Sequence, residues 1–267
     1  MRTFGLIGDP VAHSLSPAMH RAGFTAIGAD AGYDPIRIPA DEPGAVGPEM
    51  RRLAASGGGN VTIPHKSVAA SEVDEPSATV VALGACNCFW EIEAGVMAGD
   101  NTDVEGVCRA LDAHLASRSP GRVLVLGAGG AAGAAALAVT QLGASSVGIV
   151  NRTGWRARDL AARLRTIDVP AEWMEDSPTG VWDVIINATS LGLRDGDPLP
   201  ASFGRVSTGL ILDLVYGHQR TNWVLAADAA GIEWIDGREV LLQQGAACYP
   251  HWFGVEAPLD AMRRALY

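Results

Sequence analysis

Arg122-Val-Leu-Val-Leu-Gly-Ala-Gly-Gly-Ala-Ala-Gly133 is the stretch that decides the fold. Its apolar start is typical of a buried strand, and the glycines that follow predict a tight turn. A run of small residues closed by Gly143 then predicts a helix, and Val147-Gly-Ile-Val150 predicts the next strand. Strand, glycine-rich turn, helix and strand in this order form the dinucleotide-binding pattern G-x-G-x-x-G/A, with Ala132 in its third small position.

The turn and the first residues of the predicted helix are candidate ligands of a pyrophosphate. Because Gly127 and Gly129 have no Cβ, the backbone can turn tightly there and approach a phosphate. The helix N-terminus offers backbone N–H groups that no helical carbonyl uses. A glycine-rich turn in some other α/β domain is the alternative, but the strand before it and the helix after it favour nucleotide binding. The expected cofactor contacts in this turn are Gly127, Ala128, Gly129, Gly130 and Ala131.

The residues after the second strand predict which dinucleotide binds. A site for NAD usually carries Asp or Glu about 20 residues past the first glycines, where it accepts a hydrogen bond from the ribose 2′-OH. This chain has Asn151, Arg152 and Thr153 there, and no acid before Asp159. Arg152 and Arg156 can pair with a 2′-phosphate, and Thr153 can donate to it. The sequence therefore predicts NADP; the alternative is that these arginines are solvated surface charges.

Composition limits the classes of protein and partner. A chain of 267 residues is long enough for two modest domains, and 20 basic against 30 acidic residues give a net charge of −10. That charge argues against binding to nucleic acid or to an anionic membrane surface. No apolar run approaches the roughly 18 residues of a membrane helix, and Met1-Arg2 leads into a strand-like run without a signal-peptide pattern. We expect a cytoplasmic protein, either a monomer or a homodimer.

The four cysteines predict neither disulfides nor a metal site. Cys86-Asn-Cys88 is a close pair, but no cluster of Cys or His completes a metal-binding spacing. Buried thiols in a reducing compartment are the simpler interpretation, so we expect no metal. The cysteines are Cys86, Cys88, Cys108 and Cys248.

Apolar patterns predict strands that alternate with helices, which implies an α/β fold with a parallel, doubly wound sheet. The expected strands cover residues 3–8, 34–39, 80–89, 122–126, 147–150, 181–186 and 210–215. The expected helices start at Ser16 and at Lys66, and cover 48–55, 134–142, 157–164, 221–231 and 237–254, with a short tail helix over 255–267. A further amphipathic helix follows Asp103, with apolar residues at spacings of three and four, and is expected to bridge two domains.

Two serines mark the first predicted helix. Ser16-Pro17 is typical of an N-cap followed by proline at the first helical position. Together, the hydroxyls of Ser14 and Ser16 and the free N–H groups of the helix could bind a carboxylate without a full positive charge. The alternative is that Ser16 only caps the helix.

A second polar cluster lies in Asn60-Val-Thr-Ile-Pro-His-Lys66. Strand alternation points Asn60 and Thr62 to one face, and Val61 and Ile63 to the other. Lys66 follows the proline at the opening of a helix. A lone lysine is usually solvated, but its place in a polar cluster near a strand end makes Lys66 a candidate functional residue.

An ordered set of short motifs runs through the whole chain. The motifs are Gly8-Asp-Pro-Val-Ala-His-Ser-Leu-Ser-Pro17, Asn60-Val-Thr-Ile-Pro-His-Lys66, Gly84-Ala-Cys-Asn87, Gly99-Asp-Asn-Thr-Asp103, Gly127-Ala-Gly-Gly-Ala131, Asn151-Arg-Thr153, Asn187-Ala-Thr-Ser190, Asp213-Leu-Val-Tyr216 and Gln244-Gly-Ala246. With this set the chain resembles the shikimate dehydrogenase family over essentially its whole length. That family interconverts shikimate and 3-dehydroshikimate, or related cyclic hydroxy acids such as quinate, with NADP.

The resemblance implies an N-terminal α/β substrate domain and a Rossmann NADP-binding domain, with the last helix returning to the substrate domain. Residues 1–103, with 237–267 returning, would form the substrate-binding and catalytic domain. Residues 104–236 would form the NADP-binding domain.

The resemblance also implies roles for individual residues. Ser14 and Ser16 are expected to bind the substrate carboxylate, and Lys66 and Asp103 to form the catalytic acid–base pair. The pairing of Lys66 with Asp103 comes only from the resemblance, since Asp103 could equally stabilise a helix N-terminus by its charge. The residues implied for the substrate ring are Asn60, Thr62, Lys66, Asn87, Asp103 and Gln244, with Tyr216 as a further substrate contact. Thr189 is implied as a cofactor contact.

The chain departs from the usual family pattern at several positions. Cys88 stands where Thr is usual, Val104 where Gly is usual, and Arg238-Glu-Val240 where a small apolar set is usual. Because the catalytic pair is intact, these departures bear on the substrate and the rate more than on the reaction class. Quinate or another shikimate-like acid is therefore an alternative main substrate, and a non-catalytic sensor that binds the acid is an alternative function.

Overall fold

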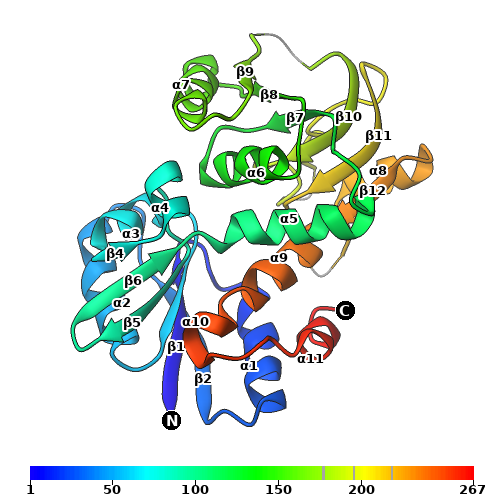
Figure 1. Ribbon diagram of the computed structural model, residues 1–267. Helices are drawn as coiled ribbons and strands as arrows, with labels where there is room; N and C mark the ends of the chain where they lie inside the picture. The colour runs from blue at the N-terminus through cyan, green and yellow to red at the C-terminus, as the bar shows by residue number, and fades with distance from the viewer. Residues whose placement is uncertain (176–177, 195, 218) are drawn as a thin grey trace. The chain divides into compact units, whose positions relative to one another are not determined.

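Helix α5 (Thr102–Leu115) is where the chain passes from one structural unit to the next (Figure 1). In the computed structural model, which describes residues 1–175, 178–194, 196–217 and 219–267, the first unit comprises Met1–Thr102 and Leu241–Tyr267. The second unit comprises Asp103–Val240. Each unit has its own sheet flanked by helices, so the predicted α/β class is confirmed.

The sheet of the second unit is parallel throughout and has the strand order β12-β11-β10-β7-β8-β9. Its strands are β7 (Arg122–Leu126), β8 (Ser146–Val150), β9 (Ala171–Trp173), β10 (Gly180–Asn187), β11 (Val206–Asp213) and β12 (Glu233–Asp236). The order runs outward in both directions from the neighbours β7 and β10, which is the doubly wound Rossmann arrangement. The carboxyl ends of these two strands therefore lie at the switch point where such sheets bind ligands.

Helices α6 (Gly130–Gln141), α7 (Gly154–Arg165) and α8 (Asn222–Ala229) alternate with these strands. The alanine-rich sequence of α6 is buried along most of its length, because small side chains let a helix approach a sheet closely. Trp223 of α8 packs into an apolar cluster with Leu124, Ile185 and Ile211 from three neighbouring strands. The predicted apolar positions of α5 are buried as well: Val104, Val107, Leu111 and Leu115.

The sheet of the first unit has the order β2-β1-β3-β5-β6-β4. Its strands are β1 (Arg2–Gly8), β2 (Ala31–Arg37), β3 (Gly58–Val61), β4 (Glu75–Pro76), β5 (Cys88–Glu93) and β6 (Val96–Asp100). Strand β5 runs antiparallel to both of its neighbours, while the other pairs are parallel. This sheet is therefore mixed, because β5 and β6 are joined by a short hairpin that leaves no room for a crossover helix.

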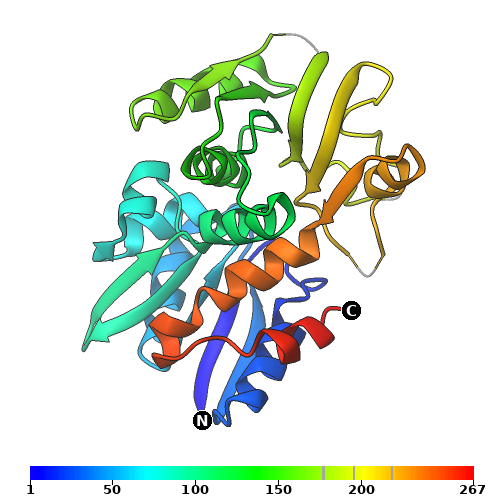
Figure 2. The same ribbon diagram turned by 45° about the vertical axis from the view of Figure 1, so that its right-hand side comes forward.

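The helices of the first unit come from both ends of the chain (Figure 2). They are α1 (Ser16–Ala26), the 3₁₀ turn η1 (Pro43–Ala45), α2 (Val46–Ala54), α3 (Lys66–Glu72), α4 (Ala78–Leu83), most of α9 (Gly237–Ala246), α10 (Tyr249–Phe253) and α11 (Leu259–Arg264). Helix α11 packs against α1, and Trp252 of α10 contacts Phe4 with 4.8 Å between ring centroids. The C-terminal segment is thus part of the first unit's aromatic core.

The prediction of a strand over residues 80–89 is wrong in its first half. Residues 80–83 belong to α4, where the Ser77 side chain accepts a hydrogen bond from the backbone N–H of Val80 at 3.3 Å. Gly84 ends this helix in the left-handed conformation, with φ of 61°. The N-cap and the glycine C-cap determine the structure here, because together they outweigh the weak preference of two valines for a strand.

The single helix expected over 237–254 is also wrong, because it is divided into α9 and α10. The chain leaves the α9 helix at Ala247 and Cys248 and starts α10 at Tyr249. Pro250 lacks a backbone N–H and cannot continue a helix from upstream, but it fits the first turn of a new one.

Within the described residues, no helix is both long and apolar enough to span a bilayer.

Candidate active site

Ser14 and Ser16 lie together at the start of α1. The Ser14 hydroxyl is 3.2 Å from the Ser16 hydroxyl oxygen, and it accepts a hydrogen bond from the Ser16 backbone N–H at 3.2 Å. The prediction that Ser16 is the N-cap is wrong, because Ser16 is already helical and Leu15 holds the cap position without a side-chain hydrogen bond. Ser14 satisfies that backbone amide instead, since a serine two residues upstream can turn back to it. Among the described residues, Ser14 is the only partner of the Ser16 hydroxyl.

Asn60 is buried at the end of β3, and protein groups hold its amide. Its Nδ2 donates to the carbonyl of Asn87 at 2.9 Å and to Sγ of Cys248 at 3.3 Å, and its Oδ1 accepts from Tyr33 at 2.8 Å. These contacts use both Nδ2 hydrogens and leave Oδ1 with one further lone pair. The structure thus fixes the orientation of the Asn60 side chain amide.

Thr62 and Lys66 follow β3 directly. The backbone N–H of Thr62 donates to Ile7 at 2.8 Å, whereas its hydroxyl has no hydrogen-bond partner among the described residues. The predicted alternation does not extend to Ile63, which is 65% exposed because the chain leaves the strand after Val61. Lys66 is half-buried and is the first residue of α3, as predicted.

The amino-acid composition gives a second reason to single out Lys66, which the motifs alone do not show. Of the 20 basic residues, 19 are arginine, and Lys66 is the one lysine in the chain. Arginine supplies a permanent positive charge wherever only charge is needed. A single position that keeps lysine is therefore consistent with the prediction that Lys66 is a functional residue.

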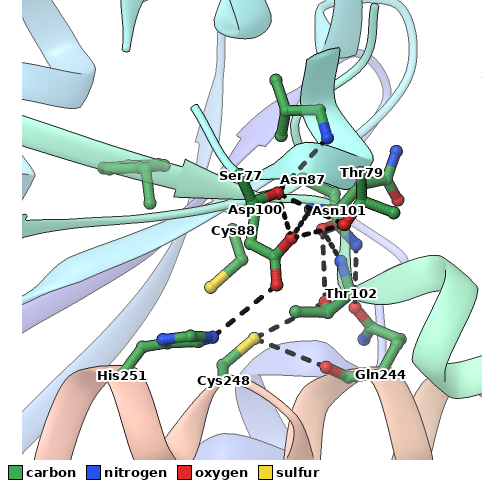
Figure 3. Close-up of polar contacts among 12 residues, drawn as sticks. Ser77, Thr79, Asn87, Cys88, Asp100, Asn101, Thr102, Gln244, Cys248 and His251 are labelled. Atoms are coloured by element: carbon green, nitrogen blue, oxygen red, sulfur yellow. Dashed lines mark hydrogen bonds and ion pairs between the residues drawn. The ribbon is translucent and has the colours of Figure 1, made fainter. Parts of the chain in front are cut away.

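Asn87 connects several of the predicted ligands (Figure 3). Its Oδ1 accepts from the backbone N–H of Thr102 at 2.7 Å and lies 3.2 Å from the Thr102 hydroxyl. Its Nδ2 donates to Oε1 of Gln244 at 3.3 Å, and Nε2 of Gln244 donates to the carbonyl of Leu241 at 3.0 Å. The structure therefore brings Asn87 and Gln244 together, although 157 positions separate them in the sequence.

The unusual Cys88 lies in the core beside Cys248. Burial, and then the contact with Cys248, raises the pKa of Cys88 well above its ordinary range, so this thiol stays protonated. Sγ of Cys248 is 3.3 Å from Nδ2 of Asn60 and 3.8 Å from the Thr102 hydroxyl. The departure from Thr at position 88 thus affects packing behind Asn60. Within the described residues, no group of three or more His, Cys, Asp or Glu side chains could hold a metal ion.

Asp103 is the second residue of α5, directly after Thr102. An acidic side chain in the first helical turn stabilises the helix, so this local role accompanies any catalytic one. Val104, where the family pattern has Gly, is 4% exposed and belongs to the apolar face of α5. Glu239 and Val240 lie in the first turns of α9, where Val240 is buried and Glu239 is half-buried.

The glycine-rich turn has the geometry that a pyrophosphate requires. Gly127 has φ of 115°, and a Cβ there would lie 2.6 Å from the carbonyl oxygen of Ala188, so only glycine fits. A Cβ at Gly129 would meet no atom within 4 Å, which leaves its backbone open to a ligand. Helix α6 starts at Gly130, and no side chain caps its N-terminus. Ala128 lies in the same turn, Ala131 is the second residue of α6, and Ala132 is buried.

The chain after β8 presents two arginines to solvent. Arg152 and Arg156 are exposed and have no acidic partner within 4 Å among the described residues, although the chain has ten more acids than bases. Nδ2 of Asn151 donates to the carbonyl of Thr153 at 3.0 Å and so shapes this loop. Thr153 precedes α7 without capping it through its side chain. These groups fit a phosphate, because nothing in the described chain neutralises the two guanidinium groups.

A buried network that sequence reasoning missed fixes the loops after β10 and β11. Oδ1 of Asn187 accepts from the backbone N–H and the hydroxyl of Thr189, at 3.1 and 2.7 Å. Nδ2 of Asn187 donates to Asp213 at 2.8 Å, and Asp213 also accepts from Thr221 at 2.6 Å and from the Val215 backbone N–H at 3.1 Å. The motifs that contain Asn187 and Asp213 were visible in the sequence. Their contact was not, because it depends on β10 and β11 being neighbours in the sheet. Tyr216 is half-buried and follows Val215.

A parallel sheet of this order, with an uncapped helix after a glycine-rich turn, defines a Rossmann-type dinucleotide-binding unit. Three family models match the chain. The substrate binding domain of shikimate dehydrogenase matches residues 6–89, shikimate / quinate 5-dehydrogenase matches 111–192, and the C-terminal domain of shikimate 5′-dehydrogenase matches 237–267. The chain belongs to the shikimate dehydrogenase family.

Relatives of this chain match it over its full length. A shikimate dehydrogenase (NADP(+)) from Halobacterium salinarum is 40% identical, covering 100% of this chain and 98% of the relative. The crystal structure of shikimate 5-dehydrogenase from Thermus thermophilus, in complex with NADP(H) and shikimate, is 34% identical, covers 100% of this chain and 98% of that chain, and has a TM-score of 0.87. Quinate dehydrogenase from Corynebacterium glutamicum, in complex with NAD, is 25% identical, with 99% and 98% coverage and a TM-score of 0.86.

Asp213 makes the stability of the protein depend on pH. Burial raises the pKa of Asp213 from 3.8 to about 6, since loss of water outweighs the hydrogen bonds from Thr221, Asn187 and Val215. The folded protein holds this proton more tightly than the unfolded chain does. The stability contributed is therefore fully present below about pH 4 and is lost as the pH rises through about 6.

We predict that Asp213→Asn removes this dependence. The free energy of unfolding of the variant, relative to the original chain, should rise by about 2 to 3 kcal/mol between about pH 4 and about pH 7, as urea unfolding at each pH would measure. Thr221→Val is the matched control, because it removes a donor to the carboxylate but keeps the carboxyl group, so the pH dependence should become steeper. Equal pH dependence in Asp213→Asn and the original chain would contradict the prediction.

Proposed function

We propose that this protein is an NADP-dependent dehydrogenase that interconverts shikimate and 3-dehydroshikimate. The observation that carries the proposal is the single lysine, Lys66, at the position where the family motif has its catalytic lysine. The relatives with NADP and shikimate in their names match the whole chain, which supports the same chemistry here.

The second unit is the proposed NADP-binding domain. The backbone of Gly129 and the uncapped start of α6 would hold the pyrophosphate, together with the neighbouring residues of the turn. Arg152 and Arg156 would pair with the 2′-phosphate, with Asn151 and Thr153 shaping that loop. Thr189, held by Asn187, would add a contact from the loop after β10. When bound, NADP supplies the hydride acceptor at its nicotinamide ring.

The first unit is the proposed substrate-binding and catalytic domain. The hydroxyls of Ser14 and Ser16 would bind the substrate carboxylate at the start of α1. Hydrogen bonds to a charged group are worth about 1.5–3 kcal/mol each, which is enough to select an acid over its ester without an arginine. The residues that would recognise the ring hydroxyls are Asn60, Thr62, Lys66, Asn87, Asp103 and Gln244, with Tyr216 as a further contact.

Acid–base chemistry at the carbinol is assigned to Lys66 and Asp103. Oxidation of a secondary alcohol requires a group that takes the hydroxyl proton as the hydride leaves. In the reductive direction the ammonium group of Lys66 is a suitable acid for the carbonyl oxygen. Asp103, held at the start of α5 by the network around Asn87, would orient Lys66 and the reacting hydroxyl.

Quinate is the second candidate substrate, because a quinate dehydrogenase is also similar to this chain over nearly its full length. The arginines after β8 favour NADP for this chain, whereas that relative was solved with NAD.

We further propose a cytoplasmic location, in keeping with four cysteines that form no disulfide, and a monomeric or homodimeric state. A non-catalytic sensor is a weaker alternative, since it would not need Lys66.

Absorbance of reduced nicotinamide, measured with a panel of acids and cofactors, tests the function directly. We expect turnover with shikimate and NADP, less with quinate, and little with the methyl ester of shikimate. A sensor would bind shikimate in calorimetry and produce no NADPH with any acid. Faster turnover of quinate than of shikimate would reassign the main substrate but not the reaction.

We predict that Lys66→Ala lowers kcat by about 10²- to 10⁴-fold while the dissociation constant for shikimate changes much less, because general acid–base groups act in the transition state. Lys66→Arg is the matched control. It keeps the positive charge but cannot give up a proton at neutral pH, so it should be about as inactive. Steady-state kinetics and calorimetry would measure both effects, and a Lys66→Arg variant with most of its kcat intact would remove proton transfer from the role of Lys66.

We predict that Arg152→Ala raises KM for NADP by about ten- to a hundredfold, as expected for loss of a contact worth roughly 1.5–3 kcal/mol, and changes KM for NAD little. Arg158→Ala is the control on α7, the helix that follows Arg152, because Arg158 lies over the Trp173 ring at 4.4 Å and is assigned no phosphate contact. If both cofactors lost affinity equally in Arg152→Ala, Arg152 would not bind the 2′-phosphate.

A further inference from the structure

The carboxylate of Asp100 lies at the junction between strand β6 and helix α5 (Figure 3). Its Oδ1 accepts hydrogen bonds from the hydroxyl of Ser77 at 2.5 Å, from the hydroxyl of Thr79 at 3.1 Å, and from the backbone N–H of Asn101 at 2.7 Å. Ser77 and Thr79 come from the start of α4. One oxygen therefore ties α4 to the backbone that leads into α5.

The second oxygen of Asp100 faces the C-terminal segment. Nε2 of His251 lies 3.6 Å from Oδ2, and the imidazole stacks on Trp90 with 4.0 Å between ring centroids. Burial raises the pKa of Asp100, but the contacts with His251, Ser77, the Asn101 backbone N–H and Thr79 together lower it to about 2. The carboxylate is thus ionised at neutral pH and held from three directions.

The two residues after Asp100 are fixed equally firmly. Nδ2 of Asn101 donates to the carbonyl of Ala85 at 2.9 Å, and the backbone N–H of Thr102 donates to Oδ1 of Asn87 at 2.7 Å. The backbone of Asp100 itself accepts from the Asn87 N–H at 3.0 Å. Helix α5 starts at Thr102, so Asp103 is reached with no flexible residue in between.

We propose that Asp100 is a positioning residue for the reaction: its carboxylate holds the backbone at Asn101, and so the start of the helix that carries Asp103. This inference rests on the proposed function. A carboxylate suits the task because it accepts several hydrogen bonds at once and can tie two hydroxyls to one backbone amide. Catalysis is sensitive to such support, since a displacement of about 1 Å at a reacting group can cost about a hundredfold in rate.

Asp74 provides a matched control for a purely structural role. Its Oδ2 accepts from the backbone N–H of Met97, at the other end of β6, at 2.9 Å, and lies 3.2 Å from Nη1 of Arg51. Asp74 is thus a second carboxylate of the first unit that holds a backbone amide of β6 and pairs with a basic side chain. It differs from Asp100 in having no contact with the segment that leads to Asp103.

The experiment compares Asp100→Ala with Asp74→Ala, using shikimate and NADP. We expect Asp100→Ala to lower kcat by about ten- to a hundredfold, with the dissociation constant for NADPH unchanged in fluorescence titration. Asp74→Ala should keep kcat within about threefold, as expected for a substitution away from the reacting groups. If Asp100→Ala folds poorly by circular dichroism, Asp100→Asn keeps the size and one acceptor oxygen and should still lose about fivefold or more in kcat.

A double-mutant cycle separates positioning from general damage. In an Asp103→Asn background, adding Asp100→Ala should lower kcat by less than about threefold, because the group that Asp100 positions is already lost. The inference is overturned if folded Asp100→Ala keeps kcat within about twofold, if Asp74→Ala loses as much, or if the losses at Asp100 and Asp103 multiply. A wild-type protein that does not oxidise shikimate would overturn the proposed function itself, whereas an active wild type with a fully active Asp100 variant overturns only this inference.

Discussion

The buried hydrogen bond from the Thr102 backbone N–H to Oδ1 of Asn87 is the contact on which the rest of the first unit's polar site depends. It satisfies an amide at the start of α5 and fixes the amide plane of Asn87, which in turn directs Nδ2 toward Gln244. A buried side chain with all these partners has little freedom to move, and removing one partner would leave another unpaired away from water. The residue before β5 thereby ties the start of α5 to helix α9 through a single side chain.

In the second unit, Asn187 and Asp213 hold the loops that follow β10 and β11. Both side chains are fully buried where parallel strands end, and both direct their oxygens toward backbone N–H groups of the following loops. Loops at the carboxyl edge of a sheet carry ligand contacts but have few ladder hydrogen bonds of their own. In each unit, a buried amide and a nearby carboxylate replace the missing ladder and hold those loops in one conformation.

The sequence predicted what is encoded locally. The glycine-rich turn, the strand before it and the helix after it appear as expected, because Gly127 needs a positive φ and close backbone approach that no other residue tolerates. Local patterns failed where distant partners or caps decide, as at Val80 in α4 and at Pro250 in the first turn of α10. The roles of Ser14, Lys66, Asp103 and the other site residues stay predictions. The Asp100 network was out of reach, because Ser77 and His251 meet it only through the folded sheet.

The scarcity of lysine gives the proposed active site a chemical property that the rest of the surface lacks. Apart from the α-amino group of Met1, the ammonium group of Lys66 is the one primary amine on the chain, because every other basic side chain is a guanidinium or an imidazole. Reagents that acylate amines therefore have one side-chain target, at the start of α3. Amine acylation would thus modify at most two amines, those of Met1 and Lys66, and the masses of the proteolytic peptides would distinguish the two.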